Sequence, residues 1–162
     1  MNNQRGFATF EAILAVTIIS LLAFVAVPKI DKVIDKILLD YEMKRLCGEI
    51  EFASSLNRSA YFSPEIFNRK IANTETDIIL QIDVDKSCYQ LQRNGKILRD
   101  RHYLPQGMKI FCSPSKLSSL QFSPSGLHTG DSGTITLTSR RGEKVEIIFD
   151  SVGRWRGNRN VN

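Results

Sequence analysis

Residues 7–27 read Phe7-Ala-Thr-Phe-Glu11-Ala-Ile-Leu-Ala-Val-Thr-Ile-Ile-Ser-Leu-Leu-Ala-Phe-Val-Ala-Val27 and are almost wholly apolar. At about 1.5 Å per residue a helix of this length spans roughly 31 Å, close to the ~30 Å hydrocarbon core of a bilayer. Its polar residues are Glu11 and three hydroxyl residues, Thr9, Thr17 and Ser20, whose side chains can bond back to helix carbonyls. The stretch therefore predicts a single membrane-spanning helix.

Two simpler interpretations fit this stretch less well. A cleaved secretory signal has a shorter apolar core followed by a small-x-small site, whereas this run ends in Val27-Pro28-Lys29. A plain signal anchor leaves Glu11 unexplained, because a carboxylate near the bilayer midplane costs about 2.5 kcal/mol or more. Such a carboxylate usually has a cationic partner. Cleavage between Gly6 and Phe7 would supply one, since the new α-amino group would lie about one helical turn from Glu11.

The same residues resemble the class III signal of type IV prepilins and type II secretion pseudopilins. The resemblance rests on Gly6 before the cut, Phe7 after it, Glu11 four residues later and Pro28 beyond the apolar run. It implies cleavage after Gly6 by a membrane-embedded prepilin peptidase and N-methylation of Phe7. It also implies that Glu11 neutralises the amino terminus of a neighbouring subunit in a filament.

The direction of insertion follows from the resemblance and not from the charges. Arg5 precedes the apolar run, whereas three lysines follow it, namely Lys29, Lys32 and Lys36. The positive-inside rule alone would place the carboxy-terminal side in the cytoplasm. The family resemblance implies the opposite, a body outside the cytoplasm on a single-pass anchor in the cytoplasmic (inner) membrane.

A second helical pattern follows Pro28. Apolar residues recur at three- and four-residue steps, at Ile30, Val33, Ile34, Ile37, Leu38, Tyr41, Leu46, Ile50, Ala53 and Leu56. Six basic and six acidic residues between 29 and 58 balance, many at i,i+4 spacing, as on an exposed helical face. We predict an amphipathic helix over 29–60 that covers a core, with a bend at Pro28 because proline removes a backbone hydrogen bond.

The pattern changes to strands in the second half. Residues 61–76 are predicted to form a loop, and strands are expected at 78–82, 87–93, 96–99, 108–112, 120–122, 134–138 and 144–149. Asn94-Gly95 suits a type I′ hairpin turn, and Arg140-Arg-Gly142 a second hairpin. The expected fold is α+β: a long N-terminal helix, transmembrane in its first half and amphipathic in its second, packed on a C-terminal antiparallel β-sheet domain. The expected segments are a leader (1–6), a transmembrane helix (7–28), an amphipathic helix (29–60) and a β-rich globular domain (61–162).

The carboxy-terminal half carries its own resemblance. Residues 122–126 (Phe-Ser-Pro-Ser-Gly), 133–137 (Gly-Thr-Ile-Thr-Leu) and 146–156 (Glu-Ile-Ile-Phe-Asp-Ser-Val-Gly-Arg-Trp-Arg) are similar to the end of the GspH/FimT group. These proteins are minor pseudopilins of type II secretion and minor pilins of type IV pili. The resemblance implies a non-enzymatic structural subunit whose partners are prepilin peptidase, other pilin or pseudopilin subunits and the membrane.

The tail suggests an alternative function. Part of the chain's net charge of +5 comes from Arg154, Arg156 and Arg159, which have no acidic residue among them. Arginines alternating with Trp155 can grip phosphates and stack on a base. Gly153-Arg-Trp-Arg156 also resembles a terminal element of minor pilins associated with DNA uptake. The alternative is a DNA-binding minor pilin of a competence pilus, and the simpler interpretation is a last strand with a solvated tail.

Other chemistry has little support in the sequence. A composition of 42% hydrophobic and 24% charged residues excludes a disordered chain and a polytopic membrane protein. His102 and His128 stand alone and no C-x-x-C pair occurs, so no metal, cofactor or catalytic residue is expected. The rival enzyme class, a signal-anchored extracytoplasmic enzyme, would require a deep polar pocket. Cys88 and Cys112 are candidates for one disulfide or for burial as small apolar residues, and Cys47 for packing in the core.

Overall fold

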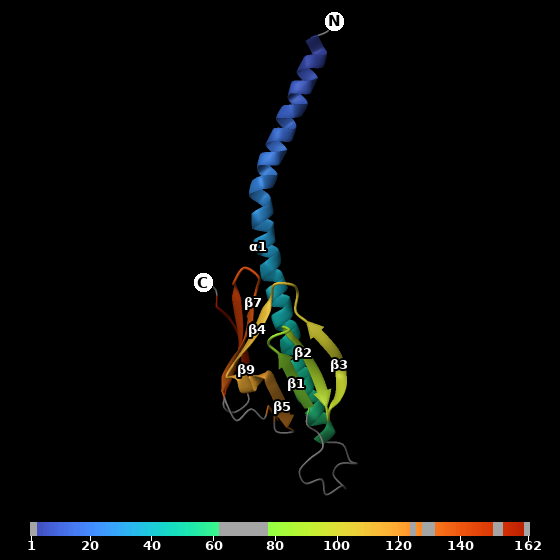
Figure 1. The fold of residues 1–162 in the computed structure, drawn as a ribbon, viewed down its shortest axis with the longest axis vertical. Helices are drawn as coiled ribbons and strands as arrows, with labels where there is room; N and C mark the ends of the chain where they lie inside the picture. Colours follow the sequence, from blue (N-terminus) through green and yellow to red (C-terminus); the bar gives the residue numbers. More distant parts are fainter. Residues whose placement is uncertain (1–2, 62–77, 124–125, 128–131, 151–153, 161–162) are drawn as a thin grey trace. The chain divides into compact units, whose positions relative to one another are not determined.

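The computed structural model describes residues 3–61, 78–123, 126–127, 132–150 and 154–160 (Figure 1). The chain divides into two compact units, residues 1–37 and residues 38–162. One helix, α1 (Asn3–Tyr61), contributes to both units, so it includes the predicted transmembrane and amphipathic segments. The predicted loop at 61–76 lies, apart from Tyr61, outside the described residues.

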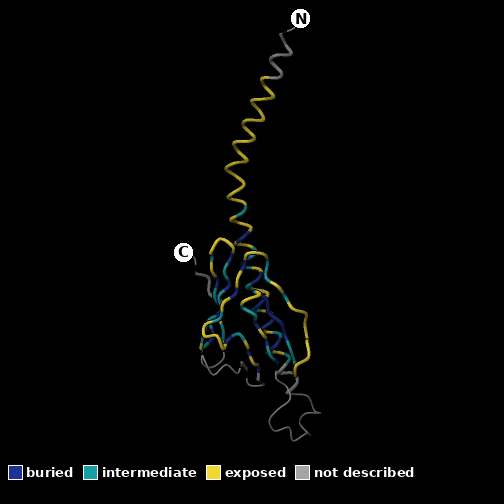
Figure 2. Tube along the Cα trace, viewed as in Figure 1, coloured by how far each residue is buried: buried dark blue, intermediate teal, exposed yellow. Residues whose placement is uncertain are grey.

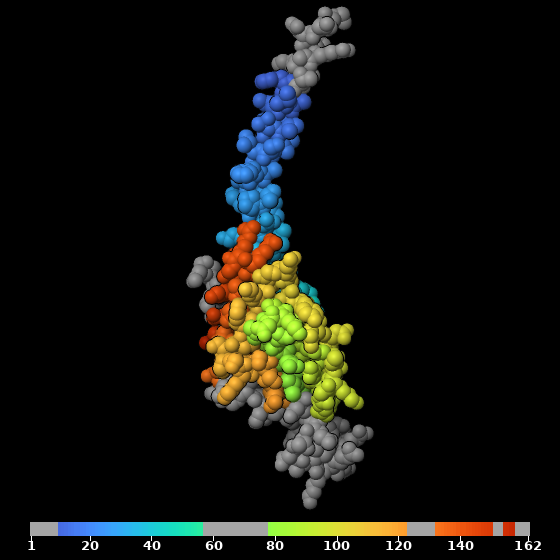
Figure 3. Space-filling model, viewed as in Figure 1, coloured from blue at the N-terminus to red at the C-terminus, as the bar shows by residue number. Residues whose placement is uncertain are grey.

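The first unit consists of the apolar part of α1. Every side chain from 10 to 30 is exposed, as Figures 2 and 3 show along this stretch. The helix continues through Pro28, which has no N–H for the carbonyl of Phe24. The hydroxyls of Thr17 and Ser20 donate to the carbonyls of Ile13 and Val16, at 2.8 and 2.7 Å, as the sequence predicted. Internal bonding of this kind makes a hydroxyl compatible with an apolar solvent.

The body, residues 38–162, buries the later part of the predicted apolar stripe of α1, at Leu46, Ile50 and Ala53, but not Tyr41. Tyr41 belongs to the predicted apolar stripe but is 56% exposed, whereas Leu39, Leu46, Ile50 and Ala53 are buried. At about 100° per residue, Tyr41 lies roughly 140° around the helix from Leu46. The early part of the stripe is also at least half exposed, at Ile30, Val33, Ile34 and Ile37. The expectation that these residues cover a core was wrong, and the buried face of the helix in the body begins at Leu39.

Two antiparallel sheets make up the rest of the body. The first has the order β3-β2-β1-β5-β6 and consists of β1 (Ile78–Asp83), β2 (Cys88–Arg93), β3 (Lys96–Tyr103), β5 (Ser119–Ser123) and β6 (Gly126–Leu127). The second has the order β4-β7-β8-β9 and consists of β4 (Lys109–Ser113), β7 (Gly133–Thr138), β8 (Lys144–Phe149) and β9 (Trp155–Asn160). A short 3₁₀ helix, η1 (Ser115–Ser118), lies between β4 and β5.

The hairpins confirm the turn predictions. Asn94 and Gly95 both have positive φ, 50° and 73°, as a type I′ turn between β2 and β3 requires. Strands β7 and β8 pair from Gly133↔Phe149 to Thr138↔Lys144, and Gly142 in their connection has a φ of 85°. The sequence did not predict strand β6 or the separation of the strands into two sheets.

One apolar core joins the helix to both sheets. It includes Leu46 and Ile50 from α1, Leu80 and Leu91 from the first sheet, and Ile147 from the second, each at most 1% exposed. Period-two alternation produces the sheet contribution, since alternate residues of β7 and β8 are buried. The predicted α+β architecture, a long N-terminal helix packed on a C-terminal antiparallel β domain, is confirmed.

Candidate functional site

The first candidate site lies in the apolar unit. The side chain of Glu11 is exposed on α1, and no described residue forms a hydrogen bond or ion pair with it. The Phe7 side chain lies outside the described residues, although Gly6 and Phe7 both fall within the bounds of α1. This one helix near the amino terminus is long and apolar enough to cross a membrane. Cleavage after Gly6, methylation of Phe7 and pairing of Glu11 remain predictions.

Within the body, a buried acid on α1 meets the edge strand β3. The Glu42 side chain is only 3% exposed, and its Oε2 lies 2.8 Å from Nε2 of His102. The His102 ring also contacts the Tyr89 ring, with 5.1 Å between the centroids. Burial, and secondarily the nearby Glu42 carboxylate, raise the pKa of the Tyr89 hydroxyl. The contact is a neutral hydrogen bond or an ion pair, depending on the protonation of His102.

A second acid, seven residues further along α1, holds the same strand. Glu49 Oε1 accepts a hydrogen bond from Arg99 Nη1 at 2.6 Å. The Arg99 guanidinium carbon also lies 4.1 Å from the centre of the Phe52 ring, within cation–π range. Arg99 is about half exposed, so we expect solvent to screen the ion pair and the pair to contribute modestly to stability.

The β2–β3 ladder is interrupted between these two links. Tyr89 pairs with His102 and Leu91 with Arg99, so β3 has one more residue than β2 in this interval, and a second register shift follows at Leu98. Extra residues of this kind bend the strand that carries them and increase its twist. A hollow of about 420 Å³ lies here, lined by Arg45, Glu49, Tyr89, Gln90, Leu91, Ile97, Leu98, Arg99, Asp100 and His102.

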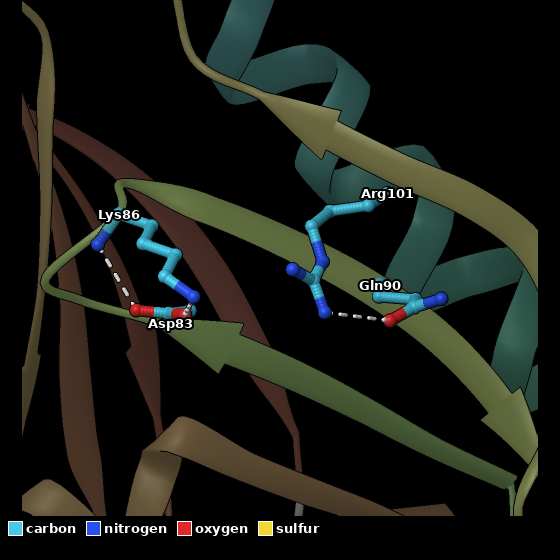
Figure 4. A network of polar contacts seen from close by, with 4 residues as sticks. All are labelled: Asp83, Lys86, Gln90 and Arg101. Carbon is cyan, nitrogen blue, oxygen red and sulfur yellow. Dashed lines mark hydrogen bonds and ion pairs between the residues drawn. The ribbon is translucent and has the colours of Figure 1, made fainter.

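Polar links also occur beside the interrupted ladder. Arg101 Nη2 donates to Gln90 Oε1 at 3.5 Å, from β3 across to β2 (Figure 4). In the turn that joins β1 to β2, the Lys86 ammonium lies 3.9 Å from Asp83 Oδ2, and the Lys86 N–H donates to Asp83 Oδ1. Arg101 and Lys86 are exposed, whereas Gln90 is buried, so these contacts link solvated side chains to the sheet. Within the described part of the chain, no cluster of His, Cys, Asp and Glu could hold a metal ion.

The structure separates the residues of the predicted DNA-binding tail. Trp155 is partly buried against the core, and a Cβ on Gly157 would collide with the end of the Met43 side chain on α1. Because side chains alternate along a strand, Arg156 points away from this packed face and is exposed. Arg154 Nε donates to Asp150 Oδ2 at 2.9 Å. The prediction that Trp155 stacks on a base is therefore not supported, because its ring packs inward.

Arg159 lies in β9, where it pairs with Val145, but its side chain lies outside the described residues. The interpretation of the tail as a last strand of the sheet is confirmed for Trp155–Asn160.

The predicted disulfide is absent, and all three cysteines are free thiols. Cys88 lies in β2 of the five-stranded sheet and Cys112 in β4 of the four-stranded sheet, so the pairing guess was wrong because strand order, which the sequence did not reveal, separates them. Burial as small apolar side chains, the alternative interpretation, fits Cys88, which is 1% exposed. Cys47 is partly buried against the core, close to its predicted position. Burial raises the pKa of Cys47 and of Cys112 to about 11.

Sequence reasoning missed the acids of the α1–β3 contact. Glu42 and Glu49 were counted with the charges of an exposed helical face, yet both are buried. Their spacing from buried leucines indicates this burial. Glu42 lies three residues after Leu39 and Glu49 three residues after Leu46, so each acid lies on the buried face of the helix. Buried carboxylates need partners, and β3 supplies them: His102 for Glu42 and Arg99 for Glu49.

The fold thus defines an α+β protein in which one long helix, α1, is apolar and exposed in its first part and packs in its later part on two antiparallel sheets. Comparison with protein-family models, with curated proteins and with solved structures gives no match for this chain.

Proposed function

We propose that the protein is a minor pilin or pseudopilin, a structural subunit of a type IV pilus or a type II secretion filament. Its apolar helix would anchor it in the cytoplasmic membrane, with the body outside the cytoplasm, until prepilin peptidase removes residues 1–6 and the subunit enters the filament. The proposal rests on the sequence pattern around Gly6, Phe7 and Glu11, and on the apolar character of α1.

The observation that carries the proposal is the continuous exposure of apolar side chains along α1. All side chains from 10 to 30 are exposed, although most of them are apolar. The exposure continues past Pro28 at Ile30, Val33, Ile34 and Ile37. An apolar surface of this length requires an apolar cover, and the lipid that suffices for residues 7–27 would leave the later residues uncovered. Helices of neighbouring subunits would cover both stretches in a filament.

Glu11 would act during assembly. It is the only charged residue between 7 and 27, and a bilayer makes an unpaired carboxylate costly. The α-amino group of a neighbouring subunit's Phe7, created by cleavage, would neutralise it. This pairing would select for correct axial register, because a subunit out of register would leave both charges unpaired.

The test is Glu11→Ala in cells that assemble filaments, with Thr17→Ala as the matched control in the same helix. We expect Glu11→Ala protein to reach the membrane at the wild-type level but to be strongly reduced in sheared filaments. Thr17→Ala should assemble normally, because the Thr17 hydroxyl bonds only its own helix among the described residues. Normal incorporation of Glu11→Ala would remove the assigned role of the carboxylate.

A DNA-binding subunit is the second candidate, and the exposed outward face of β9 favours it. Of the described arginine side chains on this strand and at its start, Arg156 is exposed with no partner among the described residues, whereas Arg154 is bonded to Asp150. A mobility shift with the detergent-solubilised full chain would test it. Salt-sensitive binding that falls on Arg156→Ala and less on Arg154→Ala would support this candidate, and no shift at low salt would exclude it.

A further inference from the structure

The outer face of the four-stranded sheet points away from the apolar core. Along β7 and β8 the residues that face the core, among them Leu137 and Ile147, are at most 1% exposed, and the residues that alternate with them point outward. Because directly paired residues of antiparallel strands share a face, the register extends this outer face to β4 and β9. Its described side chains are Lys109, Phe111, Ser113, Thr134, Thr136, Thr138, Lys144, Glu146, Ile148 and Arg156.

The register arranges these side chains in three rows across the strands. In the first row, Lys109 and Lys144 both pair with Thr138, one from each side, so their Cα atoms lie two strand spacings apart, about 10 Å. The middle row consists of Phe111, Thr136 and Glu146. The third row, on the other side of the middle row, ends at β9 with Arg156.

The charged and aromatic side chains of this face are accessible to a partner. Lys109, Lys144 and Arg156 are exposed, and Phe111 is 47% exposed. None of the three cations has an ion-pair partner among the described residues. Glu146 is partly exposed and is the one acid among the described side chains of the face. The face therefore presents three cations against one carboxylate, which favours an anionic partner.

The order of the rows selects the class of anionic partner. The cations lie in the two outer rows, whereas the middle row offers an aromatic ring, a hydroxyl and the Glu146 carboxylate. This carboxylate would repel a polymer that is charged at every unit, such as nucleic acid, but it can accept hydrogen bonds from hydroxyl groups. An acidic polysaccharide in which charged and neutral sugars alternate meets both requirements. The C–H face of its neutral sugar can pack on the exposed Phe111 ring.

We propose that the outer face of the four-stranded sheet binds an acidic polysaccharide in which charged and neutral sugars alternate. Its carboxylates pair with Lys109, Lys144 and Arg156, and a neutral sugar between them stacks on Phe111. This inference goes beyond the filament role and does not depend on it, because it concerns only residues of the body. The face would give the body a recognition function in addition to any structural one.

The test uses the full chain in phosphocholine micelles and a fluorescently labelled hyaluronan oligosaccharide, in which glucuronate alternates with N-acetylglucosamine. Fluorescence anisotropy measures binding. We expect saturable binding that weakens as the salt concentration rises, because salt screens ion pairs at an exposed face. An uncharged chitin oligosaccharide of the same length should compete poorly, because it has the neutral sugar without the carboxylates.

Two pairs of variants separate contacts of this face from general effects of charge and aromatic surface. Lys144→Gln should weaken binding roughly two- to fivefold, the factor of one exposed ion pair. Lys96→Gln, which removes an exposed lysine from the other sheet, should bind as the wild type does. Phe111→Ala should weaken binding roughly three- to tenfold. Tyr103→Ala, which removes an exposed aromatic side chain from β3, should have no effect on binding.

Thermal melts followed by circular dichroism separate binding from folding. Phe111→Tyr keeps the ring, so it should melt and bind as the wild type does even if Phe111→Ala lowers the melting temperature. The proposal is overturned if hyaluronan does not bind saturably, or if Lys144→Gln and Phe111→Ala both bind it as tightly as the wild type. It is also overturned if single-stranded DNA displaces the probe at a lower concentration than unlabelled hyaluronan does, a result that would assign this face to the DNA-binding candidate.

Discussion

Nε2 of His102 lies 2.8 Å from Oε2 of Glu42, and this contact joins an edge strand to a helix sixty residues earlier in the chain. Strand β3 is exposed at every residue except His102, so few apolar contacts hold it. Its attachment to α1 therefore relies on polar links, at His102 to Glu42 and at Arg99 to Glu49. The bulged, charged character of β3 also protects the sheet against edge-to-edge association.

Removing the Glu42 carboxylate should destabilise the body. Glu42→Ala leaves His102 without its acceptor and opens space on the buried face of α1, so we expect a loss of about 1–3 kcal/mol in the free energy of unfolding. Asp85→Ala, at an exposed position, should change it by less than about 0.5 kcal/mol. Urea unfolding of the full chain in micelles, followed by circular dichroism, measures both. If Glu42→Ala and the wild type had equal free energies of unfolding, the Glu42–His102 contact would not stabilise the body.

Two glycines should respond to alanine in opposite directions. A Cβ on Gly133 would lie 2.6 Å from the backbone oxygen of Ser113 and would also collide with Leu117, so Gly133→Ala should destabilise by roughly 1–3 kcal/mol. Gly48 has nothing within 4 Å of its Cβ position and lies inside α1. Gly48→Ala should stabilise by roughly 0.5–1 kcal/mol through helix propensity. Thermal unfolding checks the signs, and a stabilising Gly133→Ala would mean that β7 does not approach η1 as described.

The thiols should react slowly near neutral pH. Burial raises the pKa of Cys112 to about 11, so its thiolate at pH 8 is about a hundredfold scarcer than that of an ordinary cysteine. Iodoacetamide labelling of the folded chain, read by mass spectrometry, should therefore accelerate steadily as pH rises toward 11. Denatured chain should label quickly at pH 8 without reductant, because no disulfide has to be reduced. A requirement for reductant would contradict the free thiols.

The raised pKa of the Cys47 and Cys112 thiols makes the free energy of unfolding depend on pH. The folded chain keeps the Cys47 and Cys112 protons to about pH 11, whereas an unfolded thiol releases its proton near 9. The folded state therefore binds more protons between these values, so stability should fall as pH rises from about 9 toward 11. Replacing both cysteines with alanine should flatten this part of the profile. If the free energy of unfolding still fell equally steeply between about pH 9 and 11, groups other than these two thiols would cause the dependence.

The parts of the fold that follow from local chemistry were predictable from the sequence. Asn94-Gly95 requires positive φ at two successive residues, and alternation in 144–149 requires a buried face, so both hairpins were correct. Strand order depends on which apolar faces meet in space, and sequence does not encode it locally. For this reason the Cys88–Cys112 guess failed. The burial of Glu42 and Glu49 was not predictable for another reason. The helix sequence alone does not distinguish a buried acid from an exposed one, because the difference depends on where the partner strand lies.

Processing of the amino terminus should depend on Gly6. Replacing Gly6 with a bulky residue, as in Gly6→Leu, should block cleavage and leave an unprocessed chain that migrates more slowly on a gel. Arg5→Gln alters the neighbouring residue and removes the leader's one basic side chain, and it should still be processed. If Gly6→Leu were processed as fully as the wild type, the proposed cleavage after Gly6 by prepilin peptidase would be contradicted.

The most direct test is the intact mass of the chain purified from the membranes of cells that make prepilin peptidase. We predict a chain that begins at Phe7 and carries one methyl group on its α-amino nitrogen. Cleavage is expected because it creates the α-amino group that neutralises Glu11 within the apolar layer. A chain that still carries residues 1–6 would contradict it, and the protein would not be a filament subunit of this class.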